Sequence, residues 1–583
     1  MRLRAPRPWS ALGATVLLLL TTLFVTPSAG AATVRAGAVR LSVADVRPNS
    51  PSISQKPAPL DISLTLVNTT GLTLRDVTVS GARGDPITTQ SALDSAIAQP
   101  KPPSADLVAP LANTYKVTVA PHAIVDLDFR TTYDVPTDAD LCLCHNAIYP
   151  LYFTADYTPK SGATVRLSSA QTYLPSFTKQ PEKAQIAWVW PLLDRPHRQQ
   201  SDTLFLDDDL AAEVAPGGRL DQLLAVLESV GRTVPMTILT DPDLIDELAV
   251  MSAGYQVRHG TGRVAGTGAA DASAWLSRLR AVLAMPKMEI AFTPFGDPAF
   301  ETAARAGLTW TPTMPGPMEA RVTTALGGRT PPTDIAWPAN LTIGTDTLST
   351  LVGQGTKTVL LSDKTMPGGS NLSVVPSALS PVRTSHGSAV AAVTSSTVDR
   401  WAATVLRPGG PGLGALPQLV AQLALHVEKS LDRSHFIVVV PPRELTVDPA
   451  IAERTILATA STVWSKPLPL RAATSVITPV SHGQLRKRVA PPSFPAQTKA
   501  ALDYVNSSLP GLSTLFTTAA DRQTYLGTVP IAIQRAQSTT LLSDSTHSVA
   551  FARRLATSVR ALRGSVVLVR PSNGTYTLPS SNS

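Results

Sequence analysis

Four aspartates directly follow apolar runs that have the length of buried strands, and each could take part in acid–base chemistry. They are Asp194 in WPLLDR, Asp241 in ILTDP, Asp297 in PFGDP and Asp363 in LLSDK. Hydrolysis of a glycosidic bond needs one carboxylic acid to protonate the leaving oxygen and a second carboxylate as base or nucleophile. If these side chains meet at one opening, two of them could form such a pair.

Other polar and aromatic side chains stand at equivalent positions. Arg195 and His197 follow Asp194 in the segment WVWPLLDRPHR, and Trp337 and Asn340 belong to AWPAN after a later apolar run. Charged and amide groups supply hydrogen bonds to a ligand, and an indole ring offers an apolar face. We therefore expect these four residues to bind a ligand beside the aspartates.

A purely structural explanation competes with this chemical one. An aspartate in front of a helix commonly caps it, and Asp followed by Pro is a common way for a chain to leave a strand. Capping is favoured over catalysis for Asp241, Asp243 and Asp297. For Asp194 the two explanations have equal weight, because Arg195 beside it is a ready salt-bridge partner.

Several reaction classes lack their motifs. The sequence contains no G-x-S-x-G nucleophile elbow, no H-E-x-x-H, no Walker loop and no G-x-G-x-x-G after an apolar run. The histidines are scattered without the paired spacing of a metal site, so metal-dependent deacetylation lacks its ligands. The sequence predicts neither a metal nor a cofactor.

The aspartates can meet only if the strands before them lie parallel in one curved sheet. Between residues 186 and 480, short apolar runs alternate with amphipathic helical stretches, which is the pattern of parallel strands joined by crossover helices. The eight runs are IAWVWPLLD, VPMTILTDP, MEIAFTPFGDP, LTWTPTMPG, DIAWPAN, KTVLLSD, SAVAAVTSS and HFIVVVPPR. They predict a (β/α)₈-like barrel, with a seven-stranded or incomplete barrel as the alternative, and its site at the carboxyl ends of the strands.

The rest of the chain predicts a multidomain protein that combines α/β and all-β parts. Period-two alternation over residues 32–178, as in LDISLTLVNTTGLTLRDVTVSG, predicts an immunoglobulin-like β-sandwich. Residues 491–564 are mainly helical, and residues 565–583 look like the start of a truncated β domain. Residues 1–31 combine basic residues, an apolar run and a small-residue cleavage site, which is typical of a secretory signal peptide, with an uncleaved anchor as the alternative.

Charge and export narrow the choice of partner. The formal net charge is +8, and it falls to +5 without residues 1–31, which hold three arginines and no acid. The basic cluster at 486–488 and the arginines of 553–563 are interpreted as solvated faces, so nucleic acid is not an expected partner. We expect an extracellular or wall-associated protein without a transmembrane helix after signal cleavage, and cell-wall glycan or envelope proteins as partners.

The two cysteines are separated by a single residue. For Cys142 and Cys144 in DLCLCHN we rank a local or labile disulfide first, two free thiols second and a metal site third, because a bridge over one residue is strained and His145 alone completes no ligand set.

Several segments together resemble a known family. WPLLDRPHR, FLDDDLAAEVAPGGRLDQLL, TDPDLIDELAVMSAGYQV, FTPFGDP, VVVPPR and GTYTL are similar to a family of uncharacterised actinobacterial exported cell-envelope proteins, a domain of unknown function commonly encoded beside the lipid II flippase. The resemblance implies a barrel like that of polysaccharide deacetylases or glycosidases, then a further β domain and a C-terminal membrane helix. The sequence ends where that β domain should begin, so we expect a truncated form. The resemblance supplies no catalytic residue.

Two functions remain to be distinguished. The first is an exported envelope accessory or scaffold protein, with glycan binding and a link to wall synthesis as further expectations, and the absence of a strong catalytic motif favours it. The second is a glycan-active hydrolase, with a glycosidase-like or deacetylase-like activity, that uses two of the four aspartates. Whether those carboxyl groups are free at one opening or used in structural contacts separates the two.

Overall fold

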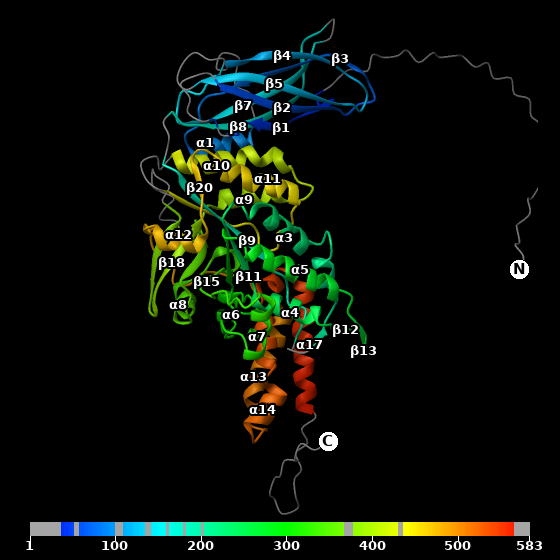
Figure 1. Cartoon of the computed structure of the whole chain (residues 1–583), viewed down its shortest axis with the longest axis vertical. Coiled ribbons are helices and arrows are strands. Elements are labelled where there is room, and N and C mark those ends of the chain that lie inside the picture. The colour runs from blue at the N-terminus through cyan, green and yellow to red at the C-terminus, as the bar shows by residue number, and fades with distance from the viewer. Residues whose placement is uncertain are drawn as a thin grey trace, which may run out of the picture.

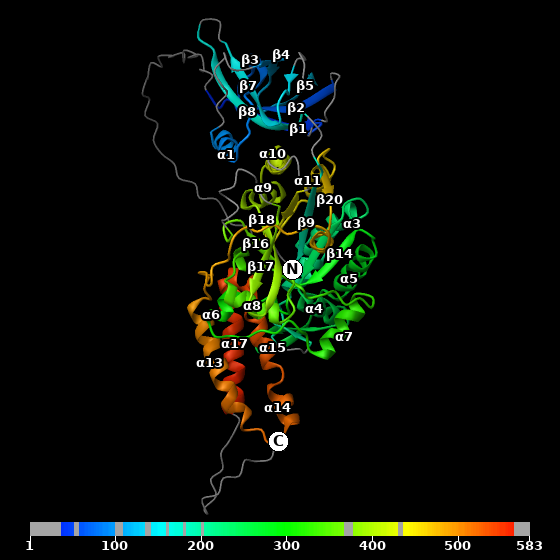
Figure 2. The same cartoon turned by 90° about the vertical axis from the view of Figure 1, so that its left-hand side faces the viewer.

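The computed structural model places the main elements in an elongated arrangement (Figures 1 and 2). It describes residues 36–49, 51, 58–99, 109–134, 141–158, 162–178, 182–199, 203–366, 377–428 and 435–564. Strands β1 to β8 lie at one end, an α/β body lies in the middle, and helices α13, α14 and α17 project at the other end. The predicted signal peptide and the predicted β segment 565–583 lie outside the described residues.

The N-terminal region forms two four-stranded sheets over one apolar core. The first sheet has the order β1-β2-β5-β6 and the second the order β4-β3-β7-β8. Alternation explains the strands: Leu60, Ile62, Leu64 and Leu66 of β2 are fully buried, while the residues between them are partly exposed. The elements are β1 (Val39–Arg47), β2 (Ala58–Asn68), β3 (Leu74–Arg83), α1 (Gln90–Ala98), β4 (Ala109–Val119), β5 (Ile124–Asp134), β6 (Leu141–Cys142), β7 (Ala147–Tyr157) and β8 (Val165–Ser176).

The immunoglobulin-like assignment is wrong for this region. Helix α1 is inserted between β3 and β4, and β6 pairs with β5 in parallel, so the region departs from the all-antiparallel sandwich that was predicted. Period-two alternation reveals that a strand has one buried face. The same alternation cannot predict the direction of a two-residue strand, nor the presence of a helix such as α1, which buries only Leu93.

Two further sheets enclose the core of the α/β body. The first has the order β14-β11-β9-β19, with β20 also paired to β9, and the second has the order β15-β16-β18-β17. Central strand β9 is buried along nearly its whole length, as expected for a parallel strand covered on both faces. The strands are β9 (Ala184–Leu192), β11 (Met236–Thr240), β14 (Met288–Phe292), β15 (Ile335–Ala336), β16 (Thr358–Ser362), β17 (Leu379–Thr384), β18 (Gly387–Thr394), β19 (Phe436–Val439) and β20 (Ser465–Pro467).

The eight-stranded barrel is wrong in both strand count and closure. Seven of the eight predicted runs contain a strand, whereas LTWTPTMPG at 308–316 contains none. Strand β17 also runs antiparallel to β18. The two sheets meet through hydrogen bonds from Phe292 N to Pro332 O and from Ala378 N to Phe436 O, so the body is barrel-like but discontinuous.

The absence of a strand in LTWTPTMPG has a specific physical cause. Pro312 and Pro315 lack the N–H groups that a ladder needs. In place of a neighbouring strand, the Gln534 side chain hydrogen-bonds both Thr311 N and Thr311 O, and Gln537 Nε2 donates to Thr309 O. Side-chain amides from distant parts of the sequence thus form the backbone hydrogen bonds that a neighbouring strand would otherwise form.

Helices cover the outside of the two sheets, and a small sheet lies beside them. Strands β10 (Leu204–Phe205), β12 (Gln256–His259) and β13 (Gly262–Ala265) form the small sheet. The helices are α2 (Asp209–Val214), α3 (Arg219–Val230), α4 (Pro242–Ser252), α5 (Ala269–Leu283), α6 (Phe300–Arg305), α7 (Gly316–Ala325), η2 (Ala339–Leu341), α8 (Thr345–Gly353), α9 (Ser396–Leu406), η4 (Gly412–Ala415), α10 (Leu416–Glu428), α11 (Pro449–Ala460) and α12 (Leu470–Val476).

The C-terminal helices share an apolar core with the second sheet of the body. Phe300, Val359, Leu502, Phe551 and Leu555 belong to one buried cluster. The helices are therefore packed as part of the body rather than attached at its surface. They are α13 (Ala496–Ser513), α14 (Ala519–Leu526), α15 (Val529–Arg535), α16 (Thr539–Ser543) and α17 (Ser545–Gly564).

The N-terminal sheets are joined to the α/β body in the same way. Ile148, Tyr173 and Phe177 belong to the buried cluster that also contains Trp188 of β9 and Leu423 of α10. In the part of the chain that the structure describes, no helix has the length and apolarity needed to cross a membrane.

Candidate functional site

The carboxyl ends of β11 and β14 bring two of the predicted aspartates together. Asp241 accepts hydrogen bonds from Asp243 N at 2.9 Å and from Gly296 N at 3.0 Å, so it caps helix α4 and also holds the turn after β14. Asp297, in that turn, forms an ion pair with Arg443, which follows β19. Both aspartates are at most 2% exposed. The capping interpretation therefore holds for Asp241, while Asp297 is used in a buried ion pair.

Burial sets the protonation of this pair. It raises the pKa of Asp241 well above the usual value, and the charges of Asp243 and Asp297 add to the shift. Burial also raises the pKa of Asp297, although the guanidinium of Arg443 opposes the change. Two adjacent carboxyl groups with raised pKa values have the chemical form of an acid–base pair, but neither is open to solvent.

Three acidic side chains on one face of α4 bind arginines from distant segments. Asp243, Asp246 and Glu247 have the i, i+3, i+4 spacing that places them on one side of the helix, and each is buried. Asp243 binds Arg535 through two hydrogen bonds, with Arg535 Nε at 2.8 Å and Nη2 at 2.5 Å. Arg535 is fully buried, so this is a closed ion pair between the body and the C-terminal helices.

The other two acids of α4 hold the segment after β9. Asp246 forms ion pairs with Arg198 and, at 2.7 Å, with Arg321. Glu247 accepts hydrogen bonds from the backbone N–H groups of His197 at 3.0 Å and Arg198 at 2.8 Å. Helix α4 therefore holds His197 and Arg198, which follow β9.

Residues Gln534–Thr540, here called the closing segment, lie across the carboxyl ends of the strands. Backbone hydrogen bonds join Ala299 N to Gln537 O and Thr539 N to Asp297 O, both at 2.8 Å. Gln534 Nε2 donates to Phe295 O at 2.7 Å, and Thr540 Oγ1 donates to Asp194 O at 3.4 Å. Every residue of the segment is 9% exposed or less. The opening predicted for a substrate is filled by the chain itself.

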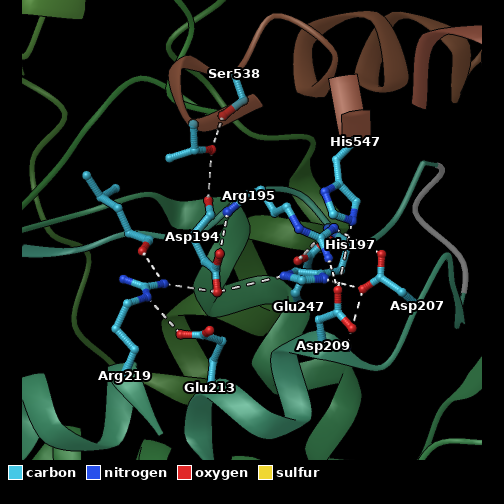
Figure 3. Close-up of polar contacts among 12 residues, drawn as sticks. Asp194, Arg195, His197, Asp207, Asp209, Glu213, Arg219, Glu247, Ser538 and His547 are labelled. Atoms are coloured by element: carbon cyan, nitrogen blue, oxygen red, sulfur yellow. Dashed lines mark hydrogen bonds and ion pairs between the residues drawn. The ribbon is translucent and has the colours of Figure 1, made fainter. Parts of the chain in front are cut away.

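Asp194 lies at the edge of this region in a further polar network, which the Asp194 backbone oxygen joins to the closing segment (Figure 3). Its carboxylate lies 3.1 Å from Arg219 Nη2 and 3.8 Å from His197 Nε2, while its Oδ1 accepts from Arg195 N. The Arg195 side chain, considered above as a salt-bridge partner of Asp194, binds other acids. The Arg195 guanidinium binds Asp207 at 3.0 Å and Asp209 at 2.5 Å instead, because both acids follow β10 on the facing side.

His197 is a buried cation between two carboxylates. Burial alone would lower its pKa, but the nearby carboxylate of Asp194 and the hydrogen bond with Asp207 raise the pKa to about 10. Burial would likewise raise the pKa of Asp194, yet the nearby His197 cation and the charge of Arg219 lower it. His197 is 1% exposed, so it is suited to holding the network together rather than to exchanging protons with a substrate.

The charge of His197 leads to a pH-dependent prediction. The folded pKa of about 10 exceeds the ordinary value of 6.5, so this stabilisation is fully present below pH 6.5 and is lost as pH rises toward 10. We expect the destabilisation caused by His197→Asn to shrink by about 1 kcal/mol per pH unit over this range. Urea unfolding at pH 6, 7.5 and 9, followed by tryptophan fluorescence, measures it. His259→Asn, at the exposed end of β12, is the control, and an effect of His197→Asn that is equal at pH 6 and pH 9 would contradict the assignment.

A metal fits poorly at the acidic surface of this network. One ligand atom each of Asp207, Asp209 and His547 lies within 4.8 Å of the others. Arg195 already neutralises both carboxylates, and the His547 ring is held by Asp544 at 2.5 Å. A cation would have to displace that guanidinium, so these residues act as an ion-pair network.

The remaining predicted site residues lie elsewhere. Asp363 accepts from Ser396 N at 3.1 Å at the start of α9. Trp337 is 4% exposed with the Arg443 guanidinium 4.5 Å above its ring, so its indole face is occupied. Asn340 is exposed within η2, at a backbone φ of 53°. Cys144 is disulfide-bonded, while the side chain of Cys142 lies outside the described residues.

Sequence reasoning missed the arginines that neutralise the aspartates. A cationic partner for α4 could have been predicted, because PDLIDEL places three acids on one helix face, and acids on a buried face need cations beside them. Arg443 and Arg535 could not have been identified, because Arg535 is 292 residues from Asp243.

Comparison with known proteins gives low similarities. No protein-family model and no curated protein matches the sequence. Among solved structures, a GH57-type branching enzyme from Pyrococcus horikoshii is 12% identical, with a TM-score of 0.43 over 64% of this chain and 88% of that chain. A 4-alpha-glucanotransferase from Thermococcus litoralis is 11% identical, with a TM-score of 0.43 over 69% and 64%.

The alpha-amylase AmyC from Thermotoga maritima is 10% identical, with a TM-score of 0.42 over 66% of this chain and 94% of that chain. The similarity is thus to enzymes named for action on glucans, and it is low in all three cases.

Proposed function

We propose that the protein is a cell-envelope accessory or scaffold protein whose α/β body supports or binds a partner without hydrolysing it. The observation that carries this proposal is the closing segment. Gln534–Thr540 bury their own polar groups over the strand ends, and the predicted catalytic carboxylates are occupied by helix capping and ion pairs. Because the C-terminal helices share an apolar core with the body, opening this site would require disruption of that core.

The cell-envelope location rests on the sequence of residues 1–31 and on the resemblance to exported actinobacterial proteins. Fractionation of cells that express the full chain tests it. We expect the protein in the wall or extracellular fraction, with residues 1–31 removed. Recovery of the intact chain from the cytoplasm would contradict the location and leave the question of hydrolysis untouched.

The second candidate is a glycan hydrolase, and a specific feature favours it. Asp241 and Asp297 are neighbours at the strand ends and both have raised pKa values, which is the pattern of a protonated acid beside a second carboxyl group. This function would require the closing segment to leave its position during each catalytic cycle.

An activity assay separates the two candidates. The full chain is incubated with purified peptidoglycan and with maltoheptaose, and newly formed reducing ends are measured. We expect release no greater than that of Asp241→Asn and Asp297→Asn, because the buried pair meets no substrate. Asp503→Asn, on the exposed face of α13, serves as a control for non-specific effects. Product release that is lost in both site variants and retained in the control would establish the hydrolase.

A further inference from the structure

Three adjoining cavities follow the junction between the N-terminal sheets and the α/β body. Their volumes are about 210, 600 and 320 Å³. Ala170 and Gln171 line both the first and the second, and Val43 and Leu413 line both the second and the third. We call this continuous depression the junction groove; Figure 2 shows the elements that border it, with β8 and β1 above α10.

The first part of the groove presents aromatic and amide side chains. Tyr152 of β7 and Gln171 of β8 are directly opposite each other in the sheet, so their side chains share one face. Ile97 of α1 and Gln418 of α10 form the other wall. All four belong to the described residues that line the cavity.

One of these amides has an unused acceptor. Gln171 Nε2 donates to the Tyr173 hydroxyl at 2.7 Å, whereas Gln171 Oε1 is buried and has no hydrogen-bond partner within the described residues. A buried carbonyl oxygen without a donor is costly. Because the Gln171 side chain lines the cavity, a rotation of its amide toward the groove would let a ligand hydroxyl group supply the missing donor.

The middle of the groove is neutral, and its charges gather at one end. Strand β1 and residues 410–414 line the middle, and the glycine-rich sequence there keeps that wall free of long side chains. At the far end Asp45 pairs with Arg47 at 2.7 Å and with Arg454 at 3.4 Å. The charged side chains of this end therefore already have partners, so the groove offers little to a polyanion.

From these features we propose that the junction groove binds an uncharged stretch of a glycan chain. Sugars combine hydroxyl groups with apolar C–H faces, which match a free amide acceptor beside a tyrosine ring. The volumes of three cavities that share lining residues suit several sugar units rather than a small molecule. This site is separate from the closed strand ends, so binding here is independent of whether the protein hydrolyses anything.

Binding to named probes tests the proposal. The full chain is titrated calorimetrically with chitohexaose and with maltoheptaose, which are uncharged chains of several sugar units. We expect at least one of them to bind, and Gln171→Leu and Tyr152→Ala each to weaken that binding by about tenfold. Gln523→Leu and Tyr525→Ala, on exposed helix α14, are matched controls that should bind like the unmodified chain.

Several outcomes would overturn the proposal. They are no binding of either glycan, or binding that both groove variants leave unchanged while their thermal unfolding matches that of the unmodified chain. Occupation of the groove by the apolar dye 8-anilinonaphthalene-1-sulfonate without glycan binding would point to a protein partner instead. If Tyr152→Ala fails to fold, Gln171→Leu still decides. Glycan cleavage in the separate activity assay would contradict the non-hydrolytic function and leave this binding site standing.

Discussion

Replacing Arg535 with alanine is expected to reduce the free energy of unfolding by about 3 to 5 kcal/mol. The change leaves the buried carboxylate of Asp243 without its cation, beside Asp241 and Glu247, which are also acidic and buried. A lone buried charge of this kind costs far more than the net contribution of the original ion pair. Urea unfolding followed by tryptophan fluorescence suits the measurement, because Trp188, Trp190 and Trp275 lie in the core of the α/β body.

Arg554→Ala is the matched control for Arg535→Ala. Arg554 is exposed on α17, and its replacement should change the free energy of unfolding by less than about 0.5 kcal/mol. A double variant, Arg535→Met with Asp243→Leu, removes both charges and should lose less than Arg535→Ala alone. An Arg535→Ala protein as stable as the Arg554→Ala control would mean that the closing segment is not held as described.

Asp246→Ala is expected to have a second large effect, again about 3 to 5 kcal/mol. Asp246 is fully buried and binds both Arg198, itself fully buried, and Arg321, which is partly exposed. Loss of the carboxylate removes a buried ion pair of Arg198 and leaves its guanidinium with the Glu247 carboxylate, 3.7 Å from Nε, under the segment that follows β9. The same unfolding measurement applies, and Asp246→Asn, which keeps the hydrogen-bond acceptor, should recover part of the loss.

Asp503→Ala is the control for Asp246→Ala, because it removes an exposed ion pair from a helix instead of a buried one. Asp503 also lies on a helix and pairs with Lys499 at 2.6 Å, but its side chain is 48% exposed. Exposed pairs contribute little, so its loss should cost less than about 0.5 kcal/mol. Equal effects of Asp246→Ala and Asp503→Ala would refute the importance that we assign to burial at α4.

The sequence located the strand ends but not what covers them. Parallel strands must end at a common edge, so a meeting of Asp241 and Asp297 could be predicted from the apolar runs alone. The partners that neutralise them could not, because Arg443 and Arg535 come from distant segments with no local pattern. Trp337 shows the same limit: an aromatic residue after a strand looks available until the Arg443 guanidinium above it is known.

The errors in the fold have a related origin. The run LTWTPTMPG has the composition of a short buried segment, and only the contacts of Gln534 and Gln537 explain why it remains a loop. In the N-terminal region, alternation identified β2 as a half-buried strand but was blind to the insertion of α1. Local periodicity reports the faces of one element, whereas the arrangement of elements depends on partners elsewhere in the chain.

The shared apolar cores at both junctions have a mechanical consequence. Tyr173 and Phe177 anchor the N-terminal sheets in the cluster around β9, and Phe551 and Leu555 anchor the C-terminal helices in the cluster of the second sheet. Apolar interfaces packed in this manner restrict hinge rotation between neighbouring parts of the protein. Tethering one extremity to a fixed surface would therefore set the direction in which the opposite extremity points, as a rigid bracket does.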